Sequence, residues 1–272
     1  MIKNLALSGG SVKGLTYLGL VKFLEENPEI YHNLESISGA SIGSIFATYL
    51  CLQIPYKHLS SFLHKNMGDF LSFDIEHLFE DFGLDKCEHL INFIGELMGI
   101  YKDLTFKELY NRSKKKLIIS ATCLSTYSTE YFNYETHPDL KVLDAIRASI
   151  SLPFLFTKVD INGKIYVDGG ILEPLPIRMF DKKDTLGLWI CDKSSENYGY
   201  NGDFSTLQGF IYNFFVCVKR NIDILTKTED NYDILKIELQ DISVIDFDLT
   251  IEKKQELIDV CYNTLKNFFT KK

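Results

Sequence analysis

The sequence predicts an α/β protein whose central sheet is mainly parallel, and two features of its first fifty residues point to that class. One short apolar run ends in the turn Ser8-Gly9-Gly10, a second ends in residues 39–43, and each leads into a helical pattern. Roughly 30 residues separate the two turns, which is the size of one βαβ unit. Because the parallel strands of such a unit end at one edge of the sheet, both turns are expected at the edge where α/β folds bind ligands.

Composition supports a single globular domain over residues 1–272. Of these residues, 46% are hydrophobic and 24% are charged, which suffices for a core and excludes intrinsic disorder. No linker, repeat or low-complexity stretch divides the chain. Helical decoration is expected as an insertion over about residues 57–110, and further strands and a helix over about 181–272.

Apolar spacing predicts the elements of the first half. Strands are expected at residues 2–7 and 34–38, and helices at 15–24 and 42–50. Residues 36–56 contain no charged side chain and are long enough to cross a bilayer. Their first half carries serines and glycines, whose hydroxyls and turns are costly in hydrocarbon. A buried strand, turn and helix is therefore the better interpretation.

The later elements follow from apolar runs and turn residues. Residues 117–123 form a continuous apolar run typical of a buried strand, and the lysines at 114–116 are expected to be its solvated entrance. Asn162-Gly163 favours a two-residue turn, so residues 159–167 are expected to form a hairpin that presents Asp168 at its end. A helix is also expected at 140–150, a strand at 186–191 and an amphipathic helix at 251–269.

Charge and cysteine usage exclude several classes of function. Lysine and arginine total 29 against 37 aspartates and glutamates, a net charge of −8, which disfavours nucleic acid and purely electrostatic docking on an anionic membrane. Any peripheral membrane contact would rest on apolar side chains instead. The six cysteines are scattered without CxxC spacing, so neither a metal site nor a disulfide framework is expected. The first residues lack the pattern of a signal peptide, and a cytoplasmic location is expected.

Residues 39–43 read Gly-Ala-Ser-Ile-Gly, a GxSxG motif between a predicted strand and a predicted helix. A serine on such a tight turn exposes its Oγ, so Ser41 is a candidate nucleophile. Gly39 and Gly43 would keep side chains away from the adjacent elements. The helix N-terminus beginning at Ile42 adds backbone N–H groups that can stabilise an oxyanion.

The first glycine turn allows two functional interpretations. A dinucleotide or phosphate loop also uses glycines between strand and helix, but Ser11 occupies the middle glycine position of G-x-G-x-x-G and no GK[ST] follows. The same N–H groups, those of Gly9, Gly10 and Ser11, can instead form an oxyanion hole that faces Ser41. A plain structural turn is the third interpretation.

A serine hydroxyl needs a base, and the histidines limit the choice. None follows His137, which lies in a polar turn, so the Ser–acid–His order of an α/β-hydrolase does not fit. Asp168, followed by Gly169 and Gly170 at a strand end, is the best candidate for a carboxylate that acts directly on Ser41. Since the ordinary pKa of aspartate is about 3.9, it would need a dry site or a strong hydrogen bond. The rival carboxylates are Asp81, Asp144 and Asp160.

Four blocks together resemble the patatin-like phospholipases, in order and spacing, over about residues 5–180. They are SGGSVKG at 8–14, GASIG at 39–43, ASISLP at 148–153 and YVDGG at 166–170. The resemblance implies a three-layer α/β/α fold with the serine on a strand–turn–helix elbow. It also implies a cofactor-free, metal-free serine acyl hydrolase of phospholipids or other acyl lipids that works through a Ser41–Asp168 dyad and an acyl-enzyme. Lys13 would be the cationic position beside the oxyanion turn, with Gly14, Gly39, Gly43, Gly169 and Gly170 as supporting motif residues.

Two departures from the family pattern keep a second interpretation open. Ser11 stands where the family usually has a third glycine, and its Cβ would narrow the approach to the turn. After Asp-Gly-Gly the family often has an asparagine pair before Leu-Pro, whereas this chain has Glu173 before Pro174. The charge of Glu173 would raise the pKa of Asp168 by repulsion. A catalytically weak lipid-binding protein of the same fold is therefore the alternative. The aromatic residues of the insertion are expected to pack as helix cores, with an acyl-chain site or a lid at the membrane as the alternative. The resemblance implies no particular oligomeric state.

Overall fold

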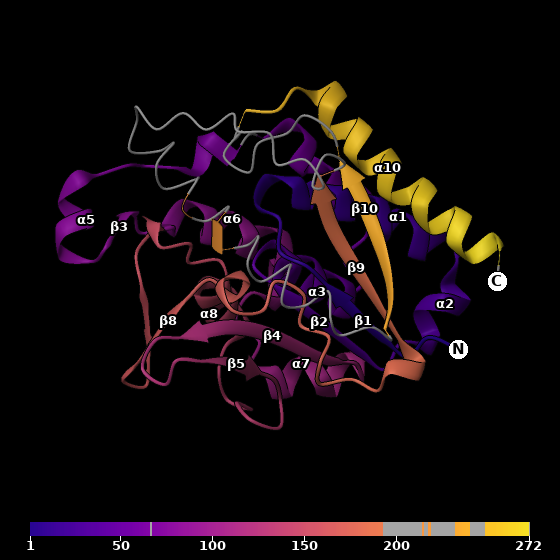
Figure 1. The fold of residues 1–272 in the computed structure, drawn as a ribbon, viewed down its shortest axis with the longest axis horizontal. Helices are drawn as coiled ribbons and strands as arrows, with labels where there is room; N and C mark the ends of the chain where they lie inside the picture. The colour runs from indigo at the N-terminus through magenta and orange to yellow at the C-terminus, as the bar shows by residue number, and fades with distance from the viewer. Residues whose placement is uncertain (66, 193–213, 215–216, 219–231, 240–247, 272) are drawn as a thin grey trace.

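The computed structural model describes residues 1–65, 67–192, 214, 217–218, 232–239 and 248–271. Its centre is one sheet in the order β10-β9-β1-β2-β4-β8-β7, with β5 paired to β4 (Figure 1). Neighbouring strands from β10 to β4 are parallel, whereas β5, β7 and β8 pair antiparallel. The predicted α/β class with a mainly parallel sheet is confirmed. The strands of this sheet are β1 (Asn4–Leu7), β2 (Ser36–Ala40), β4 (Lys116–Cys123), β5 (Ser128–Phe132), β7 (Val159–Ile161), β8 (Lys164–Val167), β9 (Thr185–Asp192) and β10 (Asp233–Leu239).

Helices pack against the central sheet (Figure 1). The α-helices are α1 (Tyr17–Glu26), α2 (Pro28–Asn33), α3 (Ile42–Leu52), α4 (Tyr56–Leu59), α5 (Ile75–Glu80), α6 (Glu88–Met98), α7 (Phe106–Ser113), α8 (Val142–Ser149) and α10 (Ile251–Thr270). Short 3-10 helices are η1 (Ser11–Thr16), η2 (Ser60–His64), η3 (Met67–Phe70), η4 (Gly99–Tyr101), η5 (Gly169–Ile171) and η6 (Lys182–Asp184).

The alternation of side chains along β1 divides the apolar interior into two parts. Leu5 and Leu7 enter the large core that contains residues of α1, α3, α8 and α10. Ala6 points to the opposite face, where it packs with Leu175 and Ile177. Helix α10 lies along α1 at one end of the molecule (Figure 1). The chain after the family-like blocks therefore contributes to the same large core as the first strand.

The charge-free stretch forms a strand, a turn and a helix, as predicted. It contains β2 and α3, and every residue of α3 is buried. No helix of the described chain is both long enough and apolar enough to cross a membrane. The absence of charge in this stretch thus reflects burial at the centre of the fold.

The predicted helical insertion contains α4 to α7, and it also contains a strand that the sequence did not indicate. This strand, β3 (Gly83–Asp85), pairs in parallel with β6 (Phe154–Phe156) to form a separate two-stranded sheet. Both strands have three residues, too few for an alternating pattern to be visible in the sequence. The expectation that the aromatic residues of the insertion pack inside is wrong for Phe73, Phe79 and Phe82, which are exposed, and it holds for Phe70 and Phe93. Phe70 stacks on Phe93 with ring centroids 4.5 Å apart.

The expectation of a solvated lysine run before β4 is wrong for Lys115. This side chain is buried, and its Nζ donates hydrogen bonds to the carbonyls of Tyr31, at 3.0 Å, and Leu34, at 2.6 Å. Those carbonyls end α2, where the helix dipole favours a cation. Burial lowers the pKa of Lys115. Its partners are distant in sequence, so the charge run alone could not indicate this role.

Candidate active site

The GxSxG segment forms the expected elbow between β2 and α3. Ser41 occupies the turn with φ 51° and ψ −129°, a backbone conformation that residues with a side chain rarely adopt. Close packing requires the two glycines beside it. A Cβ on Gly39 would lie 2.3 Å from the carbonyl of Gly43, and a Cβ on Gly43 would lie 2.5 Å from the carbonyl oxygen of Leu7. The elbow is thereby pressed against the end of β1.

Strand β4 brings Ser41 and Asp168 together from opposite sides. The last residue of β2 pairs with Ser120 of β4, and the last residue of the antiparallel β8 pairs with Thr122. One residue beyond each pair, Ser41 and Asp168 come level with the same point of β4. Ser41 Oγ donates a hydrogen bond of 2.7 Å to Oδ2 of Asp168.

The carboxylate of Asp168 lies in a dry, structured turn. The residue is 5% exposed, and the N–H of Gly170 donates to its Oδ1 at 2.7 Å. Burial raises the pKa of Asp168 to about 6, while the hydrogen bonds from Ser41 and Gly170 act in the opposite direction. Asp168 therefore meets the requirement for a dry site, with a pKa much closer to neutrality than that of a solvated aspartate.

The three rival carboxylates lie elsewhere. Asp144 is exposed on α8, Asp160 accepts a hydrogen bond within its own hairpin turn, and Asp81 pairs with a lysine. Among these four candidates, Asp168 is the one with a hydrogen bond to Ser41.

The first glycine turn faces the elbow, as expected. A Cβ built on Gly9 would lie 3.2 Å from the Cβ of Ser41. The turn is anchored to β9 through Ser8, whose Oγ accepts the N–H of Ile190 at 2.9 Å and lies 3.2 Å from the hydroxyl of Tyr17. Tyr17 also donates to the carbonyl of Ser8 at 3.0 Å. The position of this turn is thus determined by both neighbouring strands, β2 and β9.

The N–H of Gly9, a predicted oxyanion donor, is engaged within the fold in this structure. It donates at 2.9 Å to the carbonyl of Pro174 and would have to leave that carbonyl before it could stabilise a developing charge. The N–H groups of Gly10 and Ser11 in the turn, and of Ile42 at the start of α3, are the remaining candidates from the sequence.

Ser11 differs from a glycine in its backbone as well as in its side chain. Its φ is 49°, in the left-handed region that favours glycine, at the start of η1. Lys13 is buried in the same 3-10 helix. Gly14 packs against the elbow helix, because a Cβ there would lie 2.2 Å from the side chain of Ile42. The first turn and the elbow are therefore in direct contact on two sides.

Sequence reasoning missed a residue that holds the elbow. The Oγ of the fully buried Ser149 accepts the N–H of Ser41 at 2.9 Å and donates to the carbonyl of Ser120 at 2.7 Å. It thus connects α8, the elbow and β4. Ser149 lies in the ASISLP block, which is one of the four blocks that resemble the family. No local sequence feature, however, indicates which groups its hydroxyl would bond.

A second group from the same block supports Asp168. The carbonyl of Ser151 accepts the N–H of Asp168 at 2.9 Å. The guanidinium of Arg147 donates to Ser151 Oγ and, at 2.8 Å, to Oγ1 of Thr157. These hydrogen bonds hold the loop that follows α8 against the backbone of Asp168.

The expected influence of Glu173 on Asp168 takes another form. Burial, rather than repulsion from Glu173, is the leading cause of the raised pKa of Asp168. Glu173 is itself buried, and its carboxylate accepts a hydrogen bond from the hydroxyl of Tyr131. Its backbone N–H donates to the carbonyl of Gly169 at 3.1 Å, which closes the turn after Asp168.

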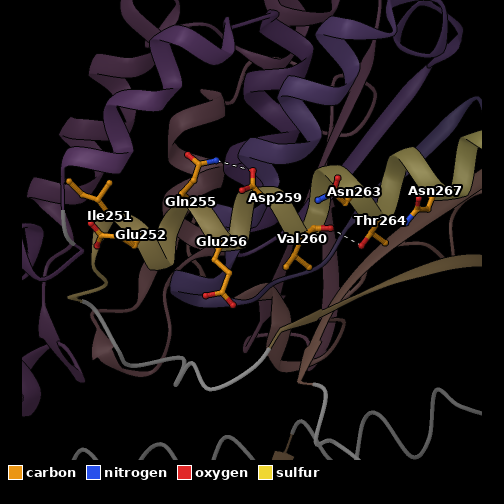
Figure 2. A pocket seen from close by; sticks show the side chains of 9 residues that line it. All are labelled: Ile251, Glu252, Gln255, Glu256, Asp259, Val260, Asn263, Thr264 and Asn267. Atoms are coloured by element: carbon orange, nitrogen blue, oxygen red, sulfur yellow. Dashed lines mark hydrogen bonds between the residues drawn. The ribbon is translucent and has the colours of Figure 1, made fainter.

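A broad surface groove of about 810 Å³ lies on α10. Figure 2 shows the side chains that line it, among them Glu252, Glu256 and Asp259. Neither Ser41 nor Asp168 lines this groove. Within the described ranges, no cluster of three or more histidine, cysteine, aspartate or glutamate residues could hold a metal ion.

Comparisons with known proteins agree with this geometry. The family model described as patatin-like phospholipase matches residues 5–181. Protein R571 of Acanthamoeba polyphaga mimivirus is 30% identical over 97% of this chain and 93% of its own length. The probable lipid hydrolase 463L of Invertebrate iridescent virus 6 is 27% identical over 84% of this chain and 79% of its own length. The structure of VipD from Legionella pneumophila superposes with a TM-score of 0.61 at 18% identity, over 97% of this chain and 66% of the VipD chain.

Proposed function

This chain belongs to the patatin-like phospholipase family and is a lipid ester hydrolase, and from that premise we propose that it cleaves fatty-acyl esters through a Ser41–Asp168 dyad and an acyl-enzyme. The observation that carries the proposal is the 2.7 Å hydrogen bond from Ser41 Oγ to the buried carboxylate of Asp168. The proposed substrates are phospholipids or other acyl lipids.

In the first half of the reaction, Ser41 Oγ attacks the ester carbonyl while its proton passes to Oδ2 of Asp168. The tetrahedral intermediate collapses, the carbon–oxygen bond to the alcohol breaks, and the leaving alkoxide takes the proton from Asp168. In the second half, a water molecule gives a proton to Asp168 and attacks the acyl carbon. The fatty acid leaves, and Ser41 regains its proton.

The negative charge of each tetrahedral intermediate needs donors that are already in place. We assign this role to the N–H groups of Gly10 and Ser11 together with that of Ile42. The last of these belongs to the first turn of α3, where N–H groups lack intrahelical partners and the helix dipole favours an anion. The contact between Gly14 and Ile42 keeps the two sources of donors in a fixed relation.

The raised pKa of Asp168 fits its proposed role as both base and acid. A carboxylate with a pKa of about 6 is ionised at neutral pH and can still hold the proton for the leaving group. Activity is therefore expected to rise as pH increases through about 6. The hydrogen bonds from Ser41 and Gly170 keep this carboxylate oriented between the two steps.

The test compares Ser41→Ala and Asp168→Asn with the wild type on a nitrophenyl ester and on a phospholipid. Both variants are expected to lose fatty-acid release, and a fluorophosphonate probe should label the wild type at Ser41 but not Ser41→Ala. Ser61→Ala and Asp144→Asn are the matched controls, because both residues are exposed and should keep wild-type turnover. Wild-type turnover in either dyad variant would refute the dyad, and a wild type that is neither labelled nor active would favour a lipid-binding protein.

A further inference from the structure

The tip of the insertion carries large apolar side chains into solvent. We call residues 73–82 the insertion tip; it contains Ile75, Phe79 and Phe82, which are 64%, 76% and 59% exposed. Helix α5, which forms most of the tip, has no buried residue and projects from the body at the end opposite to α10 (Figure 1). Elsewhere in the insertion, Phe70 and Phe93 stack on each other. A concentration of exposed apolar residues in one projecting segment marks an interaction surface.

The insertion tip is connected to the loop that supports the dyad. It ends at β3, whose Gly83 pairs with Phe154 of β6, and the N–H of Thr157 donates to the carbonyl of Asp85 at 2.9 Å. Phe154 is 42% exposed and lies three residues after Ser151, whose carbonyl accepts the N–H of Asp168. The β3–β6 sheet therefore joins the end of the insertion tip to Phe154 and to the loop that carries Ser151.

Two of these phenylalanines, Phe82 and Phe154, have a left-handed backbone conformation. Phe82 has φ 62° and Phe154 has φ 67°, in the left-handed region that is unfavourable for bulky residues. Such strain is usually tolerated where a function needs it, or where burial compensates for it. Both side chains are substantially exposed in this structure, so the burial that would compensate for the strain is not provided within the described fold.

The charges of the tip limit what it can bind. Asp74, Glu76, Glu80 and Asp81 alternate with the apolar residues, and no lysine or arginine occurs between Phe73 and Asp85. One cation approaches from outside the tip: Lys158 lies 3.6 Å from the carboxylate of Asp81 and 4.5 Å from the ring centroid of Phe82. The acidic side chains outnumber this single lysine, so an anionic surface would be repelled.

We propose that the insertion tip, together with Phe154, docks the enzyme on an uncharged or zwitterionic lipid surface such as phosphatidylcholine. This inference rests on the proposed function, because an acyl-lipid substrate resides in such a surface and must reach Ser41 from it. Ile75 and Phe79 enter the apolar layer, and the carboxylates between them remain at the level of the head groups, where the choline ammonium is cationic. The docked tip places the β3–β6 sheet, and the catalytic loop attached to it, against the lipid.

The test measures co-sedimentation of the full chain with phosphatidylcholine vesicles. Binding should fall by about tenfold or more in the double variant Ile75→Ser/Phe79→Ser, since affinity scales with the apolar area inserted. Ile100→Ser is the matched control. Ile100 is 88% exposed but lies outside the insertion tip, after the 11-residue helix α6. With phosphatidylglycerol vesicles the wild type should bind more weakly than with phosphatidylcholine, and added salt should reduce the difference by screening the repulsion.

Two further measurements separate this inference from the proposed reaction. The double variant should keep wild-type turnover of a soluble nitrophenyl ester while its turnover of phosphatidylcholine vesicles falls by about the same factor as binding. Vesicle binding by Ser41→Ala should equal that of the wild type. Equal vesicle binding by the wild type and the double variant, or stronger binding to phosphatidylglycerol at low salt, would overturn the docking surface. Failure of the wild type to bind any neutral vesicle would also overturn the docking surface, and would favour a protein as the partner of the tip.

Discussion

The two strand–turn–helix units at the edge of the sheet both place a serine at the turn, and we assign them different tasks. In both, a serine lies at the turn with a positive φ, 49° at Ser11 and 51° at Ser41. The Oγ of Ser41 contacts a buried carboxylate, and its N–H is held by Ser149. The turn at Ser11 instead follows two glycines and opens into a 3-10 helix. One turn thus presents a side chain, and we propose that the other presents backbone N–H groups.

The difference shows what a strained serine requires at each place. At the elbow the unusual φ aims Oγ at Asp168, and contacts around Gly39 and Gly43 enforce it. At the first turn the proposed task belongs to the backbone N–H groups, which a glycine would also supply. Strain should therefore be essential at Ser41 and removable at Ser11.

The largest effect is expected where the two units touch. In Gly43→Ala the new Cβ would lie 2.5 Å from the carbonyl oxygen of Leu7 and 2.7 Å from that of Ser8, so backbone must move. We expect a loss of more than about 3 kcal/mol in the free energy of unfolding and little remaining esterase activity. Denaturant titration and nitrophenyl ester turnover measure the two effects.

Gly95→Ala is the matched control for this substitution. Gly95 lies within α6, and a Cβ there would be 3.4 Å from the nearest atom, an ordinary contact. Alanine in a helix interior should stabilise by about 0.5–1 kcal/mol relative to glycine. Equal behaviour of the two variants would show that the contact between the units is not tight.

The next effect concerns the carboxylate that distinguishes the elbow from the first turn. The pKa of Asp168 is raised to about 6 in the folded chain from an ordinary value of 3.8, so between these pH values the folded chain keeps a proton that the unfolded chain has lost. Wild-type stability should therefore fall as pH rises through this window. Asp168→Asn removes this charge, and above pH 6 it should be more stable than the wild type by up to about 3 kcal/mol.

Thermal or chemical unfolding at several pH values measures this difference. The gap between Asp168→Asn and the wild type should shrink towards pH 4, where the wild-type carboxyl is also protonated. Asp160→Asn is the comparison variant, because Asp160 is exposed in a hairpin turn and should give no such gap. A gap that does not change with pH would contradict the burial argument for Asp168.

A smaller effect is expected from the hydrogen bond that holds the nucleophile. Ser149→Ala leaves the N–H of Ser41 and the carbonyl of Ser120 without this buried partner, at a cost of about 1–3 kcal/mol. If Ser149 positions the elbow, kcat should fall by about tenfold with little change in KM. Ser38→Ala is the control, since the buried Ser38 also donates to a backbone carbonyl, that of Pro176, whereas the N–H of Ser41 is bonded to Ser149. Equal losses of kcat in both variants would reduce Ser149 to a purely structural role.

The sequence allowed the elbow and its partner to be predicted because both depend on local patterns. Strand ends, glycine spacing and the absence of a late histidine indicated Ser41 and made Asp168 the best of four carboxylates, and the family resemblance implied the same pair. The fold brings the two within hydrogen-bond distance. The bond from Gly9 to Pro174 was not predictable, because its two residues lie far apart in sequence. Lys115 was expected to be solvated for the same reason, because the carbonyls that its Nζ contacts are also distant in the sequence. Local patterns indicate which elements form, whereas the partners of single polar groups depend on how distant segments pack.

The smallest effect should come from the strain at Ser11. Ser11→Gly relieves a left-handed φ that costs about 1–2 kcal/mol. Because glycine also gives the unfolded chain more conformational freedom, the free energy of unfolding should rise by only about 0.5–1 kcal/mol. Removing the Cβ should also raise kcat/KM a few-fold for a bulky phospholipid, and less for a small nitrophenyl ester, because it widens the approach to the proposed oxyanion donors. Ser11→Ala separates the causes: it keeps both the Cβ and the strained φ, so it should show neither gain. If Ser11→Ala improves turnover as much as Ser11→Gly does, the hydroxyl is responsible, and the side chain at the first turn has a role of its own.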